Sequence, residues 1–462
     1  MTLIKSISGI RGTIGGAPGE GLTPPDIVKF ASAFGTWVKD RNADKRLKII
    51  IGRDARISGN MVSRLVTGSL QGLGIDVVDL GLTTTPTVEV AVEMENADAG
   101  IILTASHNPK QWNALKLLNE KGEFISAKDG AEVLAIAEKE DYQFADVKDI
   151  GSYTQDDSYL EKHIESILAL PLVDVEAIRK KNFRIVVDAV NSTGGIYVPA
   201  MLKALGVTEV HELHCEPTGH FAHNPEPLPE NLTEISSMVT KYDAHLGIVV
   251  DPDVDRLALV CEDGEMFGEE YTLVAVADYI LGHTPGNTVS NLSSTRALRD
   301  ITTKHGQSYE ASAVGEVNVV EKMKSIDAVI GGEGNGGIIY PELHYGRDAL
   351  VGIALFLTHL AKSNKTASIL KATYPNYHIS KNKIELTPEI DVDRVLVEIE
   401  KKYKKYPVNK IDGVKIDFDN EWVHLRKSNT EPIIRIYTES ENLNTANNLA
   451  NKIISDIKEI IK

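Results

Sequence analysis

Cysteine and long apolar stretches are both scarce in this chain. Two cysteines occur among 462 residues, Cys215 and Cys261, and their spacing matches no metal motif or disulfide framework. The longest apolar stretch, residues 349–361, is interrupted by His359 and is too short to cross a bilayer, so it predicts a buried helix. Residues 1–6 lack the apolar segment of a secretory signal. We therefore expect a reducing, cytoplasmic location and no membrane anchor.

Positive charge is also in deficit. Lys and Arg together number 49 against 66 Asp and Glu, which gives a formal net charge of −17 at pH 7. Because nucleic acids and anionic membranes are polyanions, this charge argues against either as a partner. Hydrophobic residues make up 42% and charged residues 25% of the chain, as in ordinary globular proteins. An anionic small molecule remains a suitable ligand only if its site is locally basic.

Strand–loop–helix units recur along most of the chain. Residues 23–38 begin with Thr-Pro-Pro and continue with apolar residues at helical spacing, and residues 47–51 then predict a strand. The C-terminal part differs, because alternating strands at 422–426 and 433–437 precede a closing helix. We predict an α/β fold of three similar domains with mixed sheets, followed by a smaller α+β domain. The expected domains are residues 1–153, 154–261, 262–370 and 371–462.

A short polar loop follows the apolar run at residues 99–103. It reads Thr-Ala-Ser-His-Asn-Pro, with Ser106 at its third position. Ligands of open α/β sheets bind just beyond the carboxyl ends of strands, where this loop would lie. An ordinary capped turn would use the same residue types. A serine hydrolase is disfavoured, because successive side chains of an extended loop point apart, which separates His107 from Ser106, and no Gly-x-Ser-x-Gly turn is present.

Three aspartates alternate after a second apolar run, residues 246–250. Asp251, Asp253 and Asp255 would converge on one side of an extended or tightly turned segment. Such carboxylates repel one another unless a cation lies between them, and hard oxygen ligands suit Mg²⁺ or Ca²⁺. An EF-hand loop is excluded, because Arg256 stands where that loop requires glycine. A solvated acidic turn is the alternative to a Mg²⁺ site that a phosphate oxygen completes.

These two loops, in this order, resemble those of the α-D-phosphohexomutase family. Three further stretches match in the expected order: Gly-Ile-Arg-Gly at 9–12, a glycine-rich loop at 331–337, and Arg-Lys-Ser-Asn-Thr-Glu-Pro at 426–432. Five loops in order make the resemblance specific, and it covers essentially the whole chain. It implies the four-domain plan above, with the active site in a central cleft. It also implies isomerisation of a small phosphosugar through a phosphoserine, with Mg²⁺ as cofactor and hexose 1,6-bisphosphate as intermediate and activator.

The resemblance also assigns roles to single residues. Ser106 would carry the phosphoryl group and join three metal ligands, Asp251, Asp253 and Asp255. The other candidate catalytic residues are Arg11, Lys116, Arg256 and His107. Lys116 can move a proton only if neighbouring cations lower its pKa, whereas Arg11 is expected to orient and polarise. Sugar hydroxyls would bind Glu333 and Asn335, and the non-reacting phosphate would bind Arg426, Ser428, Asn429, Thr430 and Arg435.

The sugar is indicated by the loop at residues 331–337. This loop lacks the histidine that the family often has there, and it resembles branches that contain phosphoglucosamine and phosphomannose mutases. Between these branches we expect glucosamine 6-phosphate as the substrate, because amino-sugar synthesis commonly needs a dedicated mutase, with phosphomannomutase or phosphoglucomutase activity as the alternative. An aspartate-nucleophile phosphatase would leave the loops of Ser106 and Arg426 unexplained. A phosphosugar sensor without turnover is the alternative from a different functional class.

Overall fold

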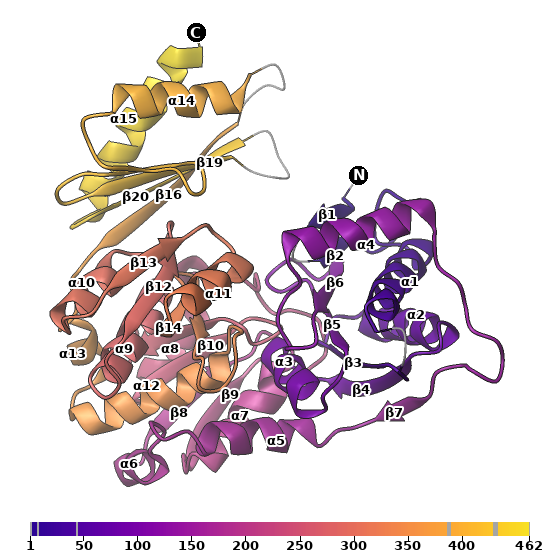
Figure 1. Ribbon diagram of the computed structural model, residues 1–462. Coiled ribbons are helices and arrows are strands. Elements are labelled where there is room, and N and C mark those ends of the chain that lie inside the picture. Colours follow the sequence, from indigo (N-terminus) through magenta and orange to yellow (C-terminus); the bar gives the residue numbers. More distant parts are fainter. Residues whose placement is uncertain (1, 7–8, 43–44, 386–389, 428–432, 462) are drawn as a thin grey trace. The chain divides into compact units, whose positions relative to one another are not determined.

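The computed structural model describes residues 2–6, 9–42, 45–385, 390–427 and 433–461. The helices and strands, which Figure 1 labels along the chain, belong to two compact units. The first unit comprises Met1–Thr272 and Asn335–Leu370, and the second comprises Leu273–Gly334 and Lys371–Lys462.

A seven-stranded mixed sheet begins the first unit, with the strand order β1-β2-β6-β5-β3-β4-β7. β3 runs parallel to both β4 and β5, and β6 is antiparallel to β5. Apolar residues fill both faces: Ile49 and Ile51 join the core under α1 and α2, while Ile50 joins a second core with α3. The strands are β1 (Ile4–Ser6), β2 (Gly9–Thr13), β3 (Lys48–Arg53), β4 (Asp76–Leu82), β5 (Ala99–Leu103), β6 (Trp112–Leu118) and β7 (Tyr153–Gln155).

The helices of this part begin where the sequence predicts them. α1 (Pro24–Asp40) follows Thr23, which forms a capping box with Asp26, and prolines occupy its first turn. Ser58 is the N-cap residue of α2, as predicted, although its side chain makes no capping hydrogen bond. The remaining helices are α2 (Gly59–Gly72), α3 (Thr85–Met94) and α4 (Ala127–Lys139).

A second mixed sheet of the first unit has the order β11-β10-β8-β9. β8 (Arg184–Asp188) runs parallel to β9 (Glu209–Leu213) and β10 (Leu246–Val250), whereas β11 (Leu257–Cys261) is antiparallel to β10. The three aspartates lie in the connection between β10 and β11. The associated helices are α5 (Tyr159–Leu168), α6 (Val175–Lys181), α7 (Gly194–Ala204), η1 (Pro229–Asn231) and α8 (Thr233–Lys241).

Residues 335–370 return to the first unit after the chain has entered the second. They contain β15 (Gly337–Ile339) and α12 (Ala349–Ser363), whose N-cap residue Asp348 accepts hydrogen bonds from two backbone N–H groups. α12 packs against α5, α6 and β11, so the buried helix predicted at 349–361 is confirmed. Among the described residues, no helix combines the length and apolar character that a membrane crossing needs.

The second unit contains three parallel strands and a separate antiparallel sheet. β12 (Asn287–Asn291) lies between β13 (Tyr309–Ser312) and β14 (Ala328–Glu333), and both pairs are parallel. The antiparallel sheet has the order β16-β20-β19-β18-β17, and α14 and α15 cover its apolar face. Its elements are β16 (His378–Glu385), α14 (Val392–Lys402), β17 (Val408–Asn409), β18 (Val414–Asp417), β19 (Trp422–Lys427), β20 (Ile433–Ser440) and α15 (Leu443–Ile461). The other helices are α9 (Glu269–Leu281), which crosses the boundary between the units, α10 (Ala297–Lys304), α11 (Glu316–Ser325) and α13 (Ala367–Lys371).

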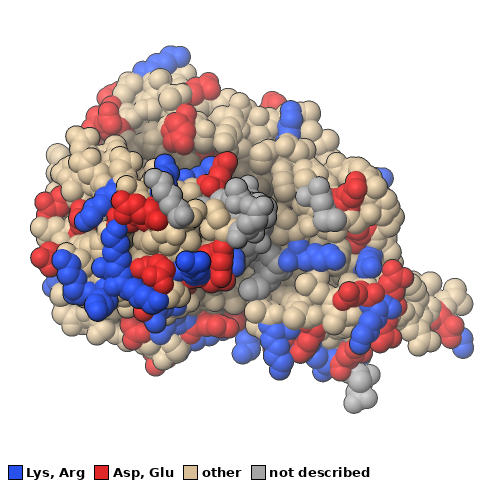
Figure 2. Space-filling view, turned by 90° about the horizontal axis from the view of Figure 1, so that it is seen from above, with Lys and Arg blue, Asp and Glu red and all other residues tan. Residues whose placement is uncertain are grey.

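The predicted fold class is confirmed, with α/β domains followed by an α+β domain. Acidic and basic side chains are interspersed on the face shown in Figure 2, although acidic residues are in excess along the chain.

Candidate active site

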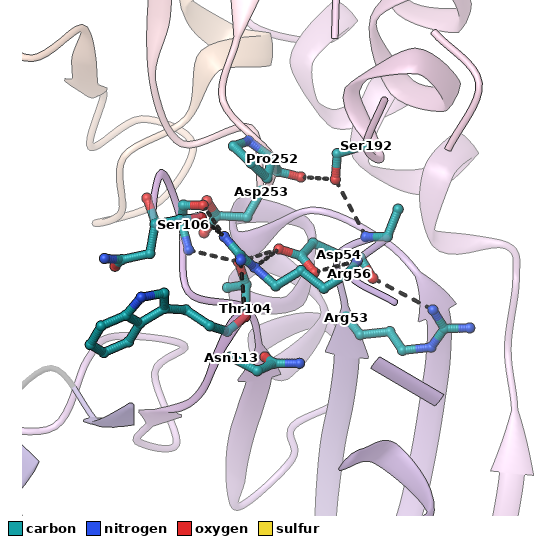
Figure 3. Close-up of polar contacts among 12 residues, drawn as sticks. Arg53, Asp54, Arg56, Thr104, Ser106, Asn113, Ser192, Pro252 and Asp253 are labelled. Carbon is teal, nitrogen blue, oxygen red and sulfur yellow. Dashed lines mark hydrogen bonds and ion pairs between the residues drawn. The ribbon is translucent and has the colours of Figure 1, made fainter. Parts of the chain in front are cut away.

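The loop that carries Ser106, residues 104–112, is built around the guanidinium of Arg56 (Figure 3). Asp54 balances this charge at 3.0 Å from Nε, and both side chains are fully buried. Because a buried charge without a partner is costly, the arginine holds the loop and its own counter-ion together. Arg56 donates hydrogen bonds to four loop carbonyls, those of Ser106, Asn108, Pro109 and Trp112, at 2.5, 2.7, 2.8 and 2.9 Å. We call residues 104–112 the serine loop.

Ser106 has a left-handed backbone conformation, with φ of 49°. Its N–H donates to Thr104 Oγ1 at 2.9 Å, and Thr104 in turn donates to Asp54 at 2.6 Å. The prediction that the side chains of Ser106 and His107 point apart is wrong, because it assumed an extended loop. Ser106 Oγ lies 3.4 Å from His107 Nδ1 and donates to Asp251 Oδ2 at 2.9 Å.

The acidic loop, residues 251–255, brings its three carboxylates together. One oxygen from each of Asp251, Asp253 and Asp255 lies within 4.8 Å of the others, and none of the three side chains reaches solvent. Asp251 Oδ1 accepts from the backbone N–H groups of Asp255 and Arg256, each at 3.2 Å. The structure thus places Ser106 beside the predicted metal ligands.

This donor set fits a hard divalent cation. Burial, reinforced by Asp255 and Asp253, raises the pKa of Asp251 well above its usual range. Asp253 Oδ1 and Asp255 Oδ1 are buried without a hydrogen-bond partner. Three carboxylates with spare oxygen atoms in a buried loop are the ligands that Mg²⁺ prefers. The solvated-turn alternative is wrong, because the loop is buried.

Lys116, on β6, faces the same carboxylates. Its Nζ lies 2.7 Å from Asp253 Oδ2 and 3.6 Å from Asp255 Oδ2. Burial alone would lower the pKa of Lys116, but Asp253 and Asp255 raise it above its ordinary value. The expectation that neighbouring cations lower this pKa is therefore wrong, because the nearest charges are carboxylates rather than arginines.

Two further side chains support the acidic loop from separate parts of the first unit. Thr85, the first residue of α3, donates from its N–H to Asp253 O at 2.9 Å and from Oγ1 to Asp253 Oδ2 at 2.5 Å. Arg347, just before α12, donates to Asp255 Oδ2 at 2.6 Å. Behind both, His344 lies 3.3 Å from Glu89 of α3 and 3.3 Å from Asp348.

The predicted cations Arg11 and Arg256 lie in the same neighbourhood. Burial lowers the pKa of Arg11, and Arg256 lowers it further. Burial also lowers the pKa of His107 well below its usual range, with Arg256, Arg347 and Arg11 adding to the effect against Asp255. His107 is therefore neutral near pH 7. Arg11, Arg256 and Arg347 thus bring positive charge close to Ser106 and the three carboxylates.

The two predicted sugar ligands belong to different units, Glu333 to the second and Asn335 to the first. Glu333, at the end of β14, accepts from Asn291 Nδ2 at 2.8 Å and from Gly315 N–H at 3.1 Å. Asn335 belongs to the first unit, where its Oδ1 accepts from Gly337 N–H at 3.2 Å. The neighbouring Gly336 has φ of 87°, and a Cβ there would lie 2.4 Å from the carbonyl oxygen of Leu257. Close backbone packing explains that glycine.

The predicted phosphate ligands Arg426 and Arg435 are direct cross-strand neighbours on β19 and β20. Lys383 on β16 stands opposite Arg435 in the same register, so three cations cross neighbouring strands on one face. Like charges opposite one another destabilise a sheet, and an anion would relieve this repulsion. We call Lys383, Arg435 and Arg426 the basic row. Ser428, Asn429 and Thr430 lie outside the described residues.

Sequence reasoning missed several residues around the site, namely Asp54, Arg56, Thr85, Lys383 and Arg347. One signal was available for the first two, because Asp-Ala-Arg at 54–56 follows the apolar strand β3 directly. The other three had no comparable signal, since single threonines, lysines and arginines are common outside functional sites.

Comparison with known families accounts for nearly the whole chain. Four descriptions of the phosphoglucomutase/phosphomannomutase family match in order: alpha/beta/alpha domain I at residues 3–144, domain II at 159–264, domain III at 268–377 and the C-terminal domain at 385–455.

Individual relatives agree with this match. The chain is 35% identical to a phosphoglucomutase/phosphomannomutase of Thermococcus kodakarensis, over 98% of this chain and 99% of that protein. It is 30% identical to a phosphoglucosamine/phosphogalactosamine mutase of Sulfurisphaera tokodaii, over 98% of both chains. The crystal structure of a phosphoglucomutase/phosphomannomutase family protein from Burkholderia thailandensis has the same fold, with a TM-score of 0.83 and 24% identity over 99% of this chain and 98% of that one.

Proposed function

Because the chain belongs to the phosphoglucomutase/phosphomannomutase family of isomerases, we propose that it interconverts hexose 6-phosphates and hexose 1-phosphates through phosphorylated Ser106. The observation that carries the proposal is the hydrogen bond from Ser106 Oγ to Asp251, beside two further buried carboxylates. Glucosamine 6-phosphate is the preferred substrate in this proposal, which the similarity to a phosphoglucosamine/phosphogalactosamine mutase supports. Phosphomannomutase or phosphoglucomutase activity is the alternative, which the relative from Thermococcus kodakarensis supports.

Two phosphoryl transfers would achieve the isomerisation. In the first, the bond between phosphorus and Ser106 Oγ breaks, a bond to the free hydroxyl oxygen of the sugar forms, the hydroxyl proton passes to a base, and Ser106 Oγ takes up a proton. The product is a bound hexose 1,6-bisphosphate. In the second, the other phosphate returns to Ser106 Oγ, which loses its proton to a base, and the released sugar oxygen takes up a proton. The serine is regenerated in its phosphorylated form, so added bisphosphate would act as an activator.

Asp251, Asp253 and Asp255 would hold Mg²⁺ together with an oxygen of the Ser106 phosphoryl group. When bound, the ion would supply a Lewis acid that withdraws electron density from the phosphoryl group. The residues of the chain prepare this arrangement, because Arg56 fixes the serine loop and Thr85 and Arg347 fix the acidic loop.

The cations of the first unit would act on the substrate side. Lys116 Nζ lies 2.7 Å from Asp253 Oδ2, and Asp253 and Asp255 raise its pKa, so we assign the protonated lysine the donation of a proton to the sugar oxygen that the second transfer releases. Arg11 and Arg256 would orient and neutralise the phosphoryl group, because a guanidinium scarcely deprotonates. His107 Nδ1, 3.4 Å from Ser106 Oγ, would orient that oxygen.

The second unit would bind the part of the sugar phosphate that is not reacting. The basic row supports this assignment, because its like charges need an anion, and residues 428–430 would add hydroxyl and backbone donors. Glu333 and, from the first unit, Asn335 would accept hydrogen bonds from sugar hydroxyls.

A panel of glucosamine, mannose, glucose and N-acetylglucosamine phosphates tests the proposal. We expect turnover with Mg²⁺ and hexose 1,6-bisphosphate, and the highest kcat/KM for glucosamine 6-phosphate. A higher kcat/KM for mannose or glucose phosphate would identify the alternative mutase. Tight binding of a sugar phosphate without any turnover would instead support a sensor and contradict an enzymatic role.

A further inference from the structure

A chain of hydrogen bonds leads from Glu333 into the loop after β12. Asn291 Nδ2 donates to Glu333 Oε1 at 2.8 Å, while Asn291 Oδ1 accepts from Ser293 N–H at 2.9 Å. Ser294 strengthens the same loop, because its hydroxyl donates to Asn291 Oδ1 at 3.1 Å and accepts from Gly334 N–H at 2.9 Å. The amide of Asn291 is thus committed at both ends, and it fixes the position of the Glu333 carboxylate.

His424 continues the connection into the C-terminal sheet. Its Nε2 lies 2.6 Å from the carbonyl oxygen of Asp412, and its Nδ1 lies 2.9 Å from Ser293 Oγ. Because a carbonyl can only accept, Nε2 carries the proton, and in the neutral ring Nδ1 then accepts from the Ser293 hydroxyl. Burial lowers the pKa of His424 to about 4, so the ring is neutral near pH 7 and both hydrogen bonds form.

Asp412 completes a ring of hydrogen bonds and also forms an ion pair with Arg426. Its Oδ2 accepts from Val314 N–H at 3.1 Å, and the next residue, Gly315, donates its N–H to Glu333 Oε1 at 3.1 Å. The same Asp412 oxygen lies 2.7 Å from Arg426 Nε. A closed hydrogen-bond ring therefore runs from Glu333 through Asn291, Ser293, His424 and Asp412 to the 314–315 turn and back. All its members belong to the second unit.

We infer that Asn291, Ser293 and His424 are positioning residues that lock Glu333 and Arg426 into one rigid template for the sugar and its non-reacting phosphate. This inference rests on the proposed function, which places sugar hydroxyls at Glu333 and phosphate at Arg426. A sugar that must bind in two orientations presents the same two groups each time. A fixed separation between their ligands therefore favours both orientations equally.

Ser293→Ala is the mildest way to open the ring. It removes one hydroxyl from a half-buried position and leaves Glu333, Arg426 and the whole first unit unchanged. Since one hydrogen bond contributes about 0.5–1.5 kcal/mol, we expect KM for both sugar phosphates to rise roughly 2- to 12-fold, with kcat within about 2-fold. His424→Phe, which keeps a ring but removes both nitrogens, should raise KM further. Ser325→Ala, which removes an exposed hydroxyl that donates to Lys322 O, is the matched control and should change neither constant.

Non-additivity provides a readout that simple loss of stability would not move. In the wild-type background, Glu333→Gln and Arg426→Ala should change the dissociation constant of glucosamine 6-phosphate non-additively, because one template holds both side chains. In the Ser293→Ala background the same two changes should become additive. Additive changes in both backgrounds, or an unchanged KM in Ser293→Ala and His424→Phe with full turnover, would overturn the inference.

Binding measured without turnover separates this inference from the proposed function. Titration of glucosamine 6-phosphate into Ser106→Ala protein, with and without Ser293→Ala, requires no phosphoryl transfer. A weaker dissociation constant in the double variant supports the template even if no mutase activity is found. An equal dissociation constant in an enzyme with normal mutase activity contradicts the template alone.

Discussion

The acidic loop of the first unit and the basic row of the second differ in how their charges are compensated by other side chains. Asp251, Asp253 and Asp255 have no exposed surface, and cations of the same chain, Lys116 and Arg347, already face them. In the basic row, Arg426 and Arg435 instead stand opposite one another, and Arg426 pairs with Asp412. The first site is compensated internally, whereas the second holds like charges together.

This difference has an energetic consequence. A buried ion pair that loses one partner leaves an uncompensated charge in a medium of low dielectric, which costs about 3–5 kcal/mol. An exposed charge that is lost costs about 0–1 kcal/mol, because water screens it. Substitutions in the first unit should therefore change both stability and chemistry. Substitutions in the basic row should change ligand binding more than stability, because relief of repulsion offsets the loss of partners such as the ion pair of Arg426 with Asp412.

The sharpest test of the chemistry is Ser106→Ala. We expect turnover to fall by at least about 10³-fold, because no other hydroxyl takes over a covalent carrier role, while binding of sugar phosphate survives. Peptide mapping should find phosphate on Ser106 after incubation of the wild-type enzyme with hexose 1,6-bisphosphate. Ser192 of the same wild-type enzyme is the matched control. It is a buried serine that donates to Pro252 O of the acidic loop at 2.7 Å (Figure 3), and it should carry no phosphate. Phosphate on another residue, with Ser106 bare, would contradict the assignment.

Asp253→Asn tests whether the buried carboxylates hold the metal. Loss of one of three carboxylates lowers both ligand strength and charge, so we expect about 10²-fold lower activity at fixed Mg²⁺ and a higher Mg²⁺ concentration for half-activation. The melting temperature should fall as well, because Lys116 loses its partner. Asp263→Asn, in the exposed turn after β11, is the control. Full activity of the wild-type enzyme in excess chelator would contradict a metal role.

The sequence predicted the parts of the site whose residues are neighbours along the chain, and it missed the residues that come from distant segments. The serine and acidic loops were visible because each directly follows its own apolar strand. Arg56, Thr85 and Arg347 come from distant segments, and no local pattern shows which loop they will contact. The orientation of the Ser106 side chain was wrongly predicted because the backbone of Ser106 is left-handed. Serine seldom adopts this conformation, so the residue type gives no sign of it.

The pKa of Lys116 was wrongly predicted for a related reason. The sequence shows that the matching loops contain arginines, but it does not show how far they lie from Lys116. The carboxylates of Asp253 and Asp255 are the charges that raise the pKa of Lys116. The basic row illustrates the same point, because Lys383 joins Arg435 and Arg426 only through strand register. The fold class, in contrast, was predictable from repeated strand–helix periodicity alone.

Arg426→Ala tests the opposite side of the comparison. A charge-assisted contact to phosphate contributes about 1.5–3 kcal/mol, so kcat/KM should fall roughly 10- to 150-fold in both directions, mostly through KM. Lys383→Ala should also lower kcat/KM, by a smaller factor. Lys427→Ala is the control, because alternation places this neighbour on the other face of β19, where it pairs with Asp393 at 3.1 Å. A fall in melting temperature with an unchanged KM would show that the row is structural.

The smallest expected effect is the pH dependence of stability that His344 gives to the first unit. Burial lowers the pKa of His344, but hydrogen bonds to Asp348 and Glu89 outweigh it and raise the pKa to about 10, and His163 adjoins the same Asp348. A pKa above that of the unfolded chain stabilises the fold fully below about pH 6.5, and this stabilisation is lost as pH rises through about 10. The melting temperature of wild-type protein should therefore decline between pH 7 and pH 10 more steeply than that of His344→Gln, since the remaining titrating groups are common to both. His211→Gln, which removes a half-exposed partner of Glu209, should decline in parallel with the wild type. Parallel curves for His344→Gln would mean that the buried cluster carries no titrating charge, and the contrast between the two units would then rest on the acidic loop alone.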